Sequence, residues 1–319
     1  MKDKKAIAMS FNWIFAIVVG GFILVLSLYA ASQFIRTSEQ TVYTETAASI
    51  VSLFDPLETG LASGKSSSIS FKKESKLYFD CFDNRNLPFG EQTIRFSEKT
   101  FGDEFAEAGQ RISIKDKYVF SEDIVEGKTM YYFSKPYFAG YKVADLMMIY
   151  SDQKTYCVHG AGDDFVDDVE GLNLKNIIFP NASLECEGIN VCFKSIGDKC
   201  DVRVVESGGY VLKDNKRLYY VDDLLFAAIF SSSDNYECNV KRIKNRFNEL
   251  AGIYLNKIEI IKRKNCEPTL GPKLLELLAF RVENSKDLLL FHDKIEEIDQ
   301  INARAKDGCR VYYNVNWKR

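Results

Sequence analysis

The chain contains the stretch FNWIFAIVVGGFILVLSLYAA at residues 11–31, in which no side chain is charged. The uncharged run extends on both sides, from residue 6 to residue 35, whereas the rest of the 319-residue chain is largely polar. About 20 apolar residues in a helix cross the roughly 30 Å hydrocarbon core of a bilayer. The stretch therefore predicts one transmembrane helix at residues 11–31, and the remaining fold has to be built outside it.

The residues that flank the apolar stretch predict its orientation. Lys2, Lys4 and Lys5 precede it, whereas Arg36 alone follows it closely. Positive charge favours the cytoplasmic side of a membrane. We therefore expect residues 1–10 in the cytoplasm and an uncleaved signal anchor. The protein would be a single-pass protein of the cell membrane with an extracytoplasmic C-terminal domain.

Two kinds of cleavage are alternatives to an uncleaved anchor. A secretory signal would be cut near Ala30-Ala31-Ser32, but the apolar region of such signals is shorter, about 7 to 15 residues. A pilin-type leader would be cut after the lysines, near Ala6. Pilin-like subunits also carry an apolar helix that continues as an amphipathic one, as Val42 and Ile50 would allow here. The glutamate common early in mature pilin helices is missing.

Residues 32–68 are predicted to form an amphipathic stalk and then a flexible linker. The linker sequence GLASGKSSS, at residues 60–68, is rich in glycine and serine, which bury little apolar area. It resembles a phosphate-binding loop, but it has one residue too few between its glycines. The extracytoplasmic domain then occupies residues 69–319, with a subdivision near residue 221 as an alternative to one unit.

The first part of this domain alternates apolar and polar residues, as in KLYFDCF at residues 76–82. Such alternation predicts half-buried strands, which we expect to pair antiparallel. We then expect a short helix from Val143 to Tyr150, a strand at residues 155–159, a helix opening at Asp163 or Asp164, and a strand at residues 177–179. That order predicts a small βαβ-like layer with parallel or mixed strands. Residues 189–221 are expected to form hairpins.

The last third is predicted to be helical. Apolar residues recur every three or four positions from Val240 to Ile261, which places them on one helix face. Asp234 and Glu237 resemble a capping pair at its start. A second helix opens near Ser285. The expected fold class is a single N-terminal transmembrane helix followed by an α+β (mixed α/β) domain, with antiparallel strands first and a helical C-terminal third packed on the sheet.

All eight cysteines follow the apolar stretch, on the side predicted to be extracytoplasmic. An even number of cysteines in an oxidising compartment favours disulfides. A hairpin centred on Ile196 would bring one pair together, and a bridge among the last three cysteines would fasten the ends of the helical part. Cysteine pairs with the close spacing of structural zinc sites are missing. The disulfide candidates are Cys81, Cys157, Cys186, Cys192, Cys200, Cys238, Cys266 and Cys309.

The two histidines, His159 and His292, limit the catalytic chemistry that the chain can perform. The GxSxG turn of serine hydrolases and the HExxH helix of zinc proteases are both missing. Cys157 and His159 would share a strand face, as a nucleophile and its base might. An ordinary disulfide cysteine beside a histidine is the simpler reading. Hydrolysis by paired carboxylates is compatible with the composition, but the sequence singles out no pair.

Two charged clusters are candidate binding sites. Asp163, Asp164, Asp167 and Asp168 could ligate calcium, although acids at a helix start also serve the helix dipole. The second cluster lies at the start of the long helix and would bind an anionic protein, glycan or lipid headgroup, or else be plainly solvated. Its members are Lys241, Arg242, Lys244 and Arg246.

Charge and motifs also exclude some partners. The formal net charge is −3, which gives no reason to expect nucleic-acid binding. The turn at residues 160–162 is too short for a dinucleotide fingerprint. We therefore expect no cofactor and no resident metal, and the membrane is the one partner that the sequence specifies, through residues 11–31.

Three segments resemble uncharacterised membrane-anchored ectodomain proteins of small-genome archaea of the DPANN type. They are SFNWIFAIVVGG at residues 10–21, FSKPYFAGYKVADL at residues 133–146 and YECNVKRIKNR at residues 236–246. The resemblance implies an archaeal cell-surface setting and supplies no activity.

These observations favour a membrane-anchored, disulfide-stabilised extracytoplasmic protein that acts as a binding module or as a subunit of a cell-envelope assembly. The lack of a recognisable catalytic constellation makes an enzyme the less favoured alternative, with a carboxylate-based site. A pilin-like subunit is the further alternative.

Overall fold

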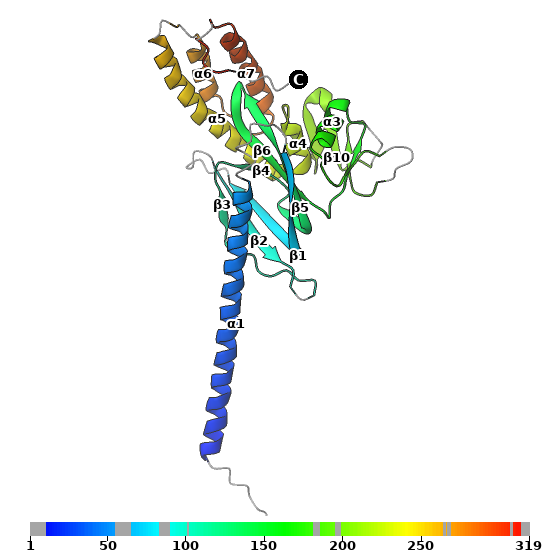
Figure 1. Ribbon diagram of the computed structural model, residues 1–319, viewed down its shortest axis with the longest axis vertical. Coiled ribbons are helices and arrows are strands. Elements are labelled where there is room, and N and C mark those ends of the chain that lie inside the picture. Colours follow the sequence, from blue (N-terminus) through cyan, green and yellow to red (C-terminus); the bar gives the residue numbers. More distant parts are fainter. Residues whose placement is uncertain are drawn as a thin grey trace, which may run out of the picture.

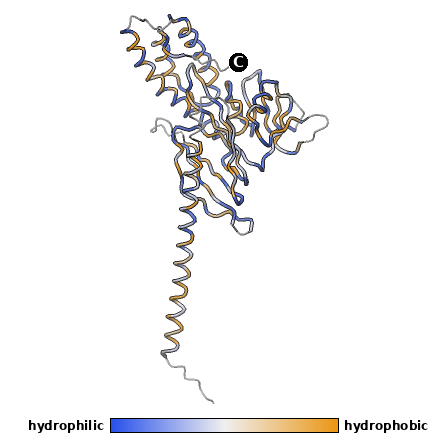
Figure 2. Tube along the Cα trace, in the orientation of Figure 1, coloured by the Kyte–Doolittle hydropathy of each residue, from blue (hydrophilic) through white to orange (hydrophobic). Residues whose placement is uncertain are grey.

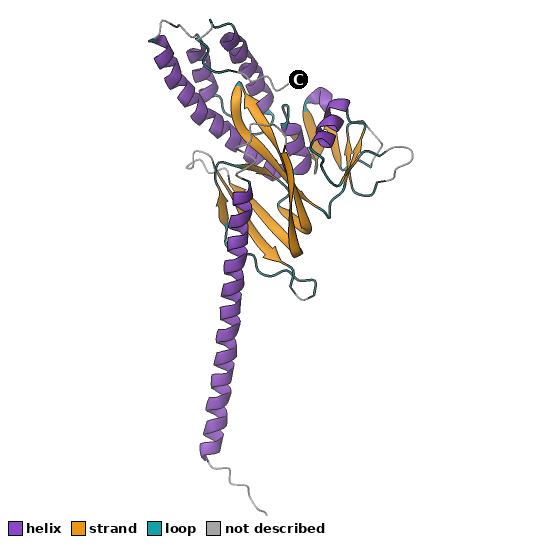
Figure 3. Ribbon diagram, viewed as in Figure 1, coloured by secondary structure: helices purple, strands orange, loops and turns teal. Residues whose placement is uncertain are grey.

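The computed structural model describes residues 11–54, 65–82, 90–100, 102–180, 186–194, 199–263, 266, 269–306 and 309–313. A long helix, α1 (Phe11–Leu53), projects from a domain of strands and helices (Figure 1). The strands occupy the middle of the domain, and helices α5 to α7 lie at the end away from the free part of α1 (Figure 3). This arrangement confirms the expected α+β class. The predicted cytoplasmic segment, residues 1–10, lies outside the described residues.

The first sheet has six strands in the order β3-β2-β1-β5-β6-β4. Its neighbours pair antiparallel, as the alternating sequence predicts, except that β4 runs parallel to β6. The strands are β1 (Lys65–Phe82), β2 (Glu91–Glu98), β3 (Ile112–Ile114), β4 (Tyr118–Phe120), β5 (Ile124–Ala139) and β6 (Tyr141–Ser151).

The start of β1 corrects the linker prediction. Residues 65–68, which we expected in the flexible linker, are paired with β5, with Ser68 opposite Tyr131. The backbone supplies the ladder hydrogen bonds whatever the side chain, so exposed serines can occupy a strand that a neighbour holds. Residues 60–64 of the predicted linker lie outside the described part of the chain.

The short helix predicted from Val143 to Tyr150 is wrong, because these residues belong to β6. Leu146, Met147 and Met148 are each fully buried (0% exposed). Alternation disappears in a strand that is covered on both faces, and the resulting apolar run cannot be told from a buried helix by its period.

The second sheet has the order β12-β11-β10-β9-β7-β8. β7, helix α3 and β8 form the predicted βαβ layer with parallel strands. β10 also runs parallel to β9, so the hairpin predicted between them is wrong. The elements are β7 (Tyr156–His159), α3 (Asp163–Gly171), β8 (Ile177–Ile178), β9 (Ile189–Cys192), β10 (Val202–Val205), β11 (Tyr210–Lys213) and β12 (Lys216–Tyr219), with a 3-10 turn η1 (Glu206–Gly208).

The predicted hairpin between β11 and β12 is confirmed. Its two turn residues, Asp214 and Asn215, have φ values of 50° and 59°. Two consecutive positive φ values match the twist of the flanking strands, and aspartate and asparagine tolerate them better than most residues do.

The helical third consists of α4 (Leu224–Phe230), α5 (Ser233–Lys262), α6 (Leu270–Ala279) and α7 (Asp287–Ala303). The predicted stripe on α5 faces inward, since Val240, Ile243, Phe247, Ile258 and Ile261 are buried.

The capping prediction for α5 is wrong in its residues. Ser232 is the N-cap, and its Oγ accepts a hydrogen bond from the backbone N–H of Asn235. Asp234 pairs instead with Lys216, and Glu237 accepts hydrogen bonds from the backbone N–H and the hydroxyl of Ser285. A serine directly before the first turn is well placed to satisfy the free amides, which leaves both acids for tertiary contacts.

Two apolar cores lie on opposite faces of the first sheet. Val119, Met147 and Ile149 belong to the core under α1, whereas their neighbours Phe120 and Met148 belong to the core under α4, α5 and the second sheet. Successive side chains of a strand point to opposite faces. The larger core runs without a break through the chain on both sides of residue 221, so a subdivision there is not seen.

We predict that Phe54→Ala costs far more stability than Leu53→Ala. The Phe54 side chain is fully buried (0% exposed) and its ring contacts Tyr132, whereas Leu53 is 47% exposed. Removing a buried phenylalanine costs about 3 to 5 kcal/mol, and an exposed substitution about 0.5 kcal/mol. Denaturant unfolding of the full chain in detergent measures both. Equal costs for the two variants would contradict the buried junction.

Candidate functional site

The free part of α1 is the most exposed apolar surface of the molecule. From Trp13 to Phe34 its large apolar side chains are exposed, and Figure 2 shows hydrophobic residues along this part of the helix. Among the described residues it is the one helix long and apolar enough to cross a membrane. An apolar surface of this extent has to be covered by lipid or by other apolar helices.

The last turns of α1 are buried against the first sheet. Tyr43, Ala47, Ile50 and Phe54 lie on one helix face and join the core beneath it. The Tyr43 and Phe96 ring centroids are 5.7 Å apart. The expected amphipathic stalk is therefore an unbroken part of the anchor helix, and it belongs to the core of the domain.

Two polar details fix the helix at this junction. The backbone N–H of Gln110 donates to Thr44 Oγ1 at 2.9 Å. A Cβ atom at Gly109 would lie 2.7 Å from the Thr44 backbone nitrogen, which no side chain could accommodate without movement of the backbone. Glycine at this position lets the chain after β2 approach the helix backbone closely.

All eight cysteines form disulfides in the structure: Cys81–Cys238, Cys157–Cys186, Cys192–Cys200 and Cys266–Cys309. The prediction of the third bridge is confirmed, although parallel strands rather than a hairpin bring its cysteines together. The fourth is a predicted bridge that fastens the end of α5 to the segment after α7. The first, between β1 and α5, was beyond sequence reasoning because its cysteines are 157 residues apart.

The Cys157–His159 dyad is wrong, because the Cys157 sulfur is bonded to Cys186. The His159 Nε2 atom lies 3.0 Å from Asn190 Oδ1, and the backbone N–H of Asn190 donates to Asp201 Oδ2. The histidine therefore joins β7 to β9 through polar contacts, and no thiolate stands beside it.

The acidic cluster does not assemble a metal site. Asp163 and Asp164 lie in the first turn of α3, where they favour the helix dipole, and Asp167 is exposed. Asp168 pairs with Lys135 at 2.7 Å. Within the described ranges no three metal-binding side chains of histidine, cysteine or acid type come together.

The predicted basic surface on α5 is wrong for two of its four residues. Arg242 and Lys244 are only 1% and 4% exposed, so neither is presented to a partner or to solvent. Lys241 and Arg246 are half-buried and engaged in interactions of their own. Helix periodicity assigns a face to each position, but long basic side chains can also be held inside by polar partners that the sequence does not reveal.

Arg242 is held by neutral acceptors and an aromatic ring. Its guanidinium donates to Gln92 Oε1 at 3.1 Å and to Asn239 Oδ1 at 2.7 Å, and it lies 5.0 Å from the Tyr118 ring centroid. Burial lowers the pKa of this arginine to about 10. Because β2, β4 and α5 all contribute to the network, it fixes α5 to the first sheet close to the Cys81–Cys238 bridge.

Lys244 is held in a similar way at the α5–α6 contact. Its ammonium donates to Asn248 Oδ1 and to the backbone oxygen of Leu277, and it faces the rings of Phe247 and Phe291. Burial lowers its pKa from the ordinary 10.5 to about 8. A lysine in this state costs stability at neutral pH, where it is protonated.

Lys135, on β5, is a third buried cation, and no sequence pattern indicated its burial. Its Nζ atom lies 2.7 Å from Asp168 Oδ2, 3.4 Å from Asp223 Oδ1 and 5.1 Å from the Phe226 ring centroid. Burial raises the pKa of Asp223, and the ammonium opposes that rise. The carboxylates of Asp168 and Asp223 thus form ion pairs with the same buried ammonium, and these pairs join α3 and the start of α4 to the first sheet.

Lys213, on β11, is buried as well. Its ammonium donates to Glu122 Oε1 at 2.6 Å and to the backbone oxygens of Ile229 and Ser231 at 3.3 and 2.8 Å. These oxygens lie at the carboxyl end of α4, where the helix dipole favours a cation. Arg242, Lys135 and Lys213 thus each join a helix to a sheet, whereas Lys244 joins α5 to α6.

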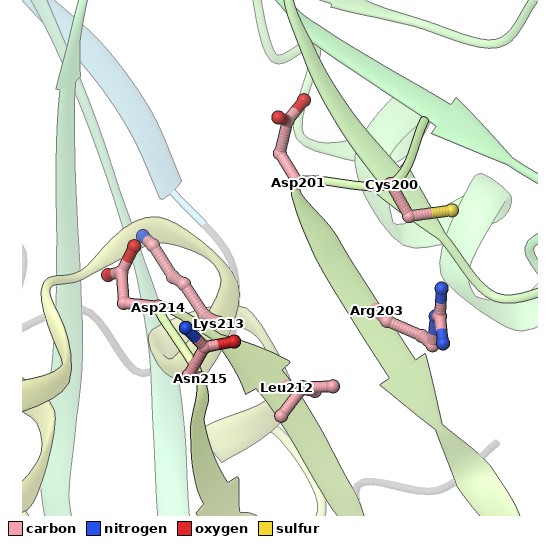
Figure 4. A pocket seen from close by; sticks show the side chains of 7 residues that line it. All are labelled: Cys200, Asp201, Arg203, Leu212, Lys213, Asp214 and Asn215. Atoms are coloured by element: carbon pink, nitrogen blue, oxygen red, sulfur yellow. The ribbon is translucent and has the colours of Figure 1, made fainter. Parts of the chain in front are cut away.

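The best-formed hollow is about 200 Å³ in volume. Ligand pockets usually enclose about 300 to 1,000 Å³ with converging polar groups. Figure 4 shows side chains spread along two neighbouring strands and a turn, without a common focus. The Lys213 ammonium is already occupied, so the hollow offers no strong ligand site. Its residues are Cys200, Asp201, Arg203, Leu212, Lys213, Asp214 and Asn215.

No protein-family model, curated protein or solved structure matches this chain. The apolar N-terminal helix and the four disulfides fit a disulfide-stabilised, membrane-anchored extracytoplasmic protein.

We predict that loss of the Cys81–Cys238 bridge costs more stability than loss of Cys192–Cys200. The two bridges join cysteines 157 and 8 residues apart. From the entropy of loop closure in the unfolded chain, the expected stabilisation is about 5 kcal/mol for Cys81–Cys238 and about 2.5 kcal/mol for Cys192–Cys200. Double cysteine-to-serine variants compared by denaturant unfolding under non-reducing conditions measure the difference. A larger loss for the short loop would contradict the expectation.

Lys244→Met should change how stability depends on pH. Between about pH 8 and pH 10.5 the unfolded chain holds a proton at Lys244 that the folded chain does not, so wild-type stability rises with pH in this window. The variant lacks this rise. The free energy of unfolding of the wild type minus that of the variant should therefore increase by about 3 kcal/mol from pH 7.5 to pH 10.5.

Denaturant unfolding at a series of pH values measures this difference. The exposed Lys286, replaced in the same way, is the matched control, for which we expect no comparable change. A constant difference for Lys244→Met would show that the amine titrates normally.

Proposed function

We propose that this protein is a structural subunit of a cell-envelope assembly, which holds a rigid domain at a fixed height and orientation outside the membrane. The observation that carries the proposal is the continuity of α1 from Phe11 to Leu53. A helix of this length extends about 65 Å. Its free part suits a membrane span, and its buried end belongs to the core of the domain, so little rotation between anchor and domain is expected.

The construction of the domain supports a mechanical role. Cys81–Cys238 links β1 to α5, Cys266–Cys309 fastens the end of α5 to the segment after α7, and buried cations add further links between sheets and helices. Such links restrict both the unfolded chain and local opening. The predicted catalytic dyad is not formed, because Cys157 is bonded to Cys186. The hollow beside β10 and β11 is small and open to solvent. Recognition of a protein or glycan partner would then use the outer surface of the domain.

A pilin-like subunit is the second candidate, and a specific observation favours it. An apolar helix that projects freely and then packs its last turns on an antiparallel sheet suits a subunit whose helices bundle inside a filament. The two functions differ in the fate of the N-terminus. Intact-mass analysis of the protein from membranes would find residues 1–5 retained in a permanent anchor and removed in a pilin-like subunit.

The rigid connection can be tested by inserting four glycines between Ser38 and Glu39. This site lies between the apolar run and the buried turns of α1, so membrane insertion and domain folding should persist. We expect the wild type to be extracted with native lipid as a complex larger than one chain, and the inserted variant as a smaller species. Mass measurement of single lipid-disc particles compares them.

The matched control carries the same four glycines after Lys5, ahead of the apolar run. It should assemble as the wild type does. If the variant inserted after Ser38 assembles to the same mass as this control, rigid display is not required and the proposal is wrong.

A further inference from the structure

The domain begins very close to the point where α1 leaves its apolar environment. Phe34 and Ile35 are 77% and 56% exposed and end the uncharged run, and Arg36 follows them. Tyr43 is already buried in the domain. Tyr43 follows Arg36 by seven positions, a rise of only about 10 Å along the helix. The domain is therefore not held away from the membrane by a stalk.

One end of the first sheet lies beside this short interval. β2 runs back toward the free end of α1, and the loop after it is the part of the domain nearest that end (Figure 1). Burial raises the pKa of Tyr43, and the carboxylates of Glu39 and Glu98 raise it further. The Phe96 ring packs on Tyr43, with ring centroids 5.7 Å apart. Glu98, the last residue of β2, lies two residues further along the strand, up to about 7 Å closer to the free end of α1, which brings it near the level of Glu39.

Lys72, Lys73 and Lys99 lie at this end of the sheet, where Ser75 of β1 pairs with Glu98 of β2. Lys73 Nζ lies 4.0 Å from Glu98 Oε2. Lys99 Nζ lies 2.7 Å from Glu74 Oε2 and 3.1 Å from Asp103 Oδ1. Lys72 is exposed, and the Lys73 side chain is 61% exposed. We call this set of residues the membrane-side rim: Lys72, Lys73, Glu74, Glu98, Lys99 and Asp103.

We propose that the membrane-side rim rests in the lipid headgroup layer of the membrane that α1 spans, where Lys72 and Lys73 bind lipid phosphates. The headgroup layer is about 5 to 8 Å thick on each side of the hydrocarbon core. The uncharged run ends at Ile35, and Glu39 follows about 6 Å further along the helix. A bilayer that covers α1 to the end of this run therefore places the rim within or directly against its headgroup layer.

The charges of the rim fit this occupant. Lys99 lies between the carboxylates of Glu74 and Asp103. Paired charges of opposite sign can lie among the paired charges of a zwitterionic headgroup layer. Lys73 approaches Glu98 only at the 4.0 Å limit of an ion pair, and Lys72 is exposed beside it. Long lysine side chains can extend their ammonium groups toward phosphates while the stems cover apolar surface. The lipid layer is also continuous with the surface that covers α1.

The inference rests on the membrane anchoring in the proposed function and adds a second contact to it. A single helix leaves a domain free to tilt with the helix, whereas a helix and a rim together define a plane. The domain would then present the far ends of α5 to α7 outward at a fixed angle.

The test uses the full chain in lipid nanodiscs with a fluorescent label at Lys72→Cys. Because the native cysteines are all paired, the new thiol is the labelling site. The matched control is Lys262→Cys, in the last turn of α5 at the far end of the domain (Figure 1). Lipids with a nitroxide headgroup should quench the Lys72 label at least threefold more strongly than the Lys262 label. Equal quenching at both positions would overturn the proposal.

A second measurement tests the lysines themselves. A label at the exposed Thr100 reports the position of the rim, and Lys72→Glu with Lys73→Glu reverses both charges. We expect headgroup quenching of the Thr100 label to fall at least twofold, and unchanged quenching would contradict phosphate binding by these lysines. Co-purification of each variant with the nanodisc checks the anchor independently, so a failure of anchoring and a failure of the rim contact give different results.

Discussion

The burial of the last turns of α1 in the core under the first sheet is the contact on which the rest of the structure depends. Tyr43, Ala47, Ile50 and Phe54 make the anchor helix part of that core. Without this packing the sheet would have an apolar face open to water, and the helix would end in a flexible joint. One set of side chains thus completes the domain and couples the orientation of the domain to that of the helix.

Buried cations perform the corresponding task on the other side of the sheet. Arg242 is accommodated by neutral amides and an aromatic ring, Lys135 by two carboxylates, and Lys213 by a carboxylate and the carboxyl end of a helix. Burying a charge is costly unless it is paired and hydrogen-bonded. Their polar partners therefore allow only one relative placement of helix and sheet, which favours a unique fold more than a high stability.

The sequence predicted the parts of the fold that local pattern determines. The uncharged run identified the free part of α1, because the length and composition of an apolar helix can be read directly from the sequence. The spacing from Val240 to Ile261 identified the buried face of α5. Sequence-based prediction failed where contacts with distant parts of the chain determine the local structure. β6 lost its alternation because both faces are covered, and Arg242 of α5 lies in the interior because Gln92, more than a hundred residues earlier, provides an acceptor. For the candidate site, the anchor was predictable, whereas the membrane-side rim required the contact between β2 and α1.

The order of the disulfides along the chain has a consequence for export. The Cys81–Cys238 bridge encloses two others, Cys157–Cys186 and Cys192–Cys200, and no bridge crosses another. In the proposed orientation the chain leaves the membrane from its anchor outward, and Cys81 emerges before its partner, with four other cysteines between them. Cys81 would then have to stay reduced, or be released from a wrong partner by thiol–disulfide exchange, until Cys238 emerges.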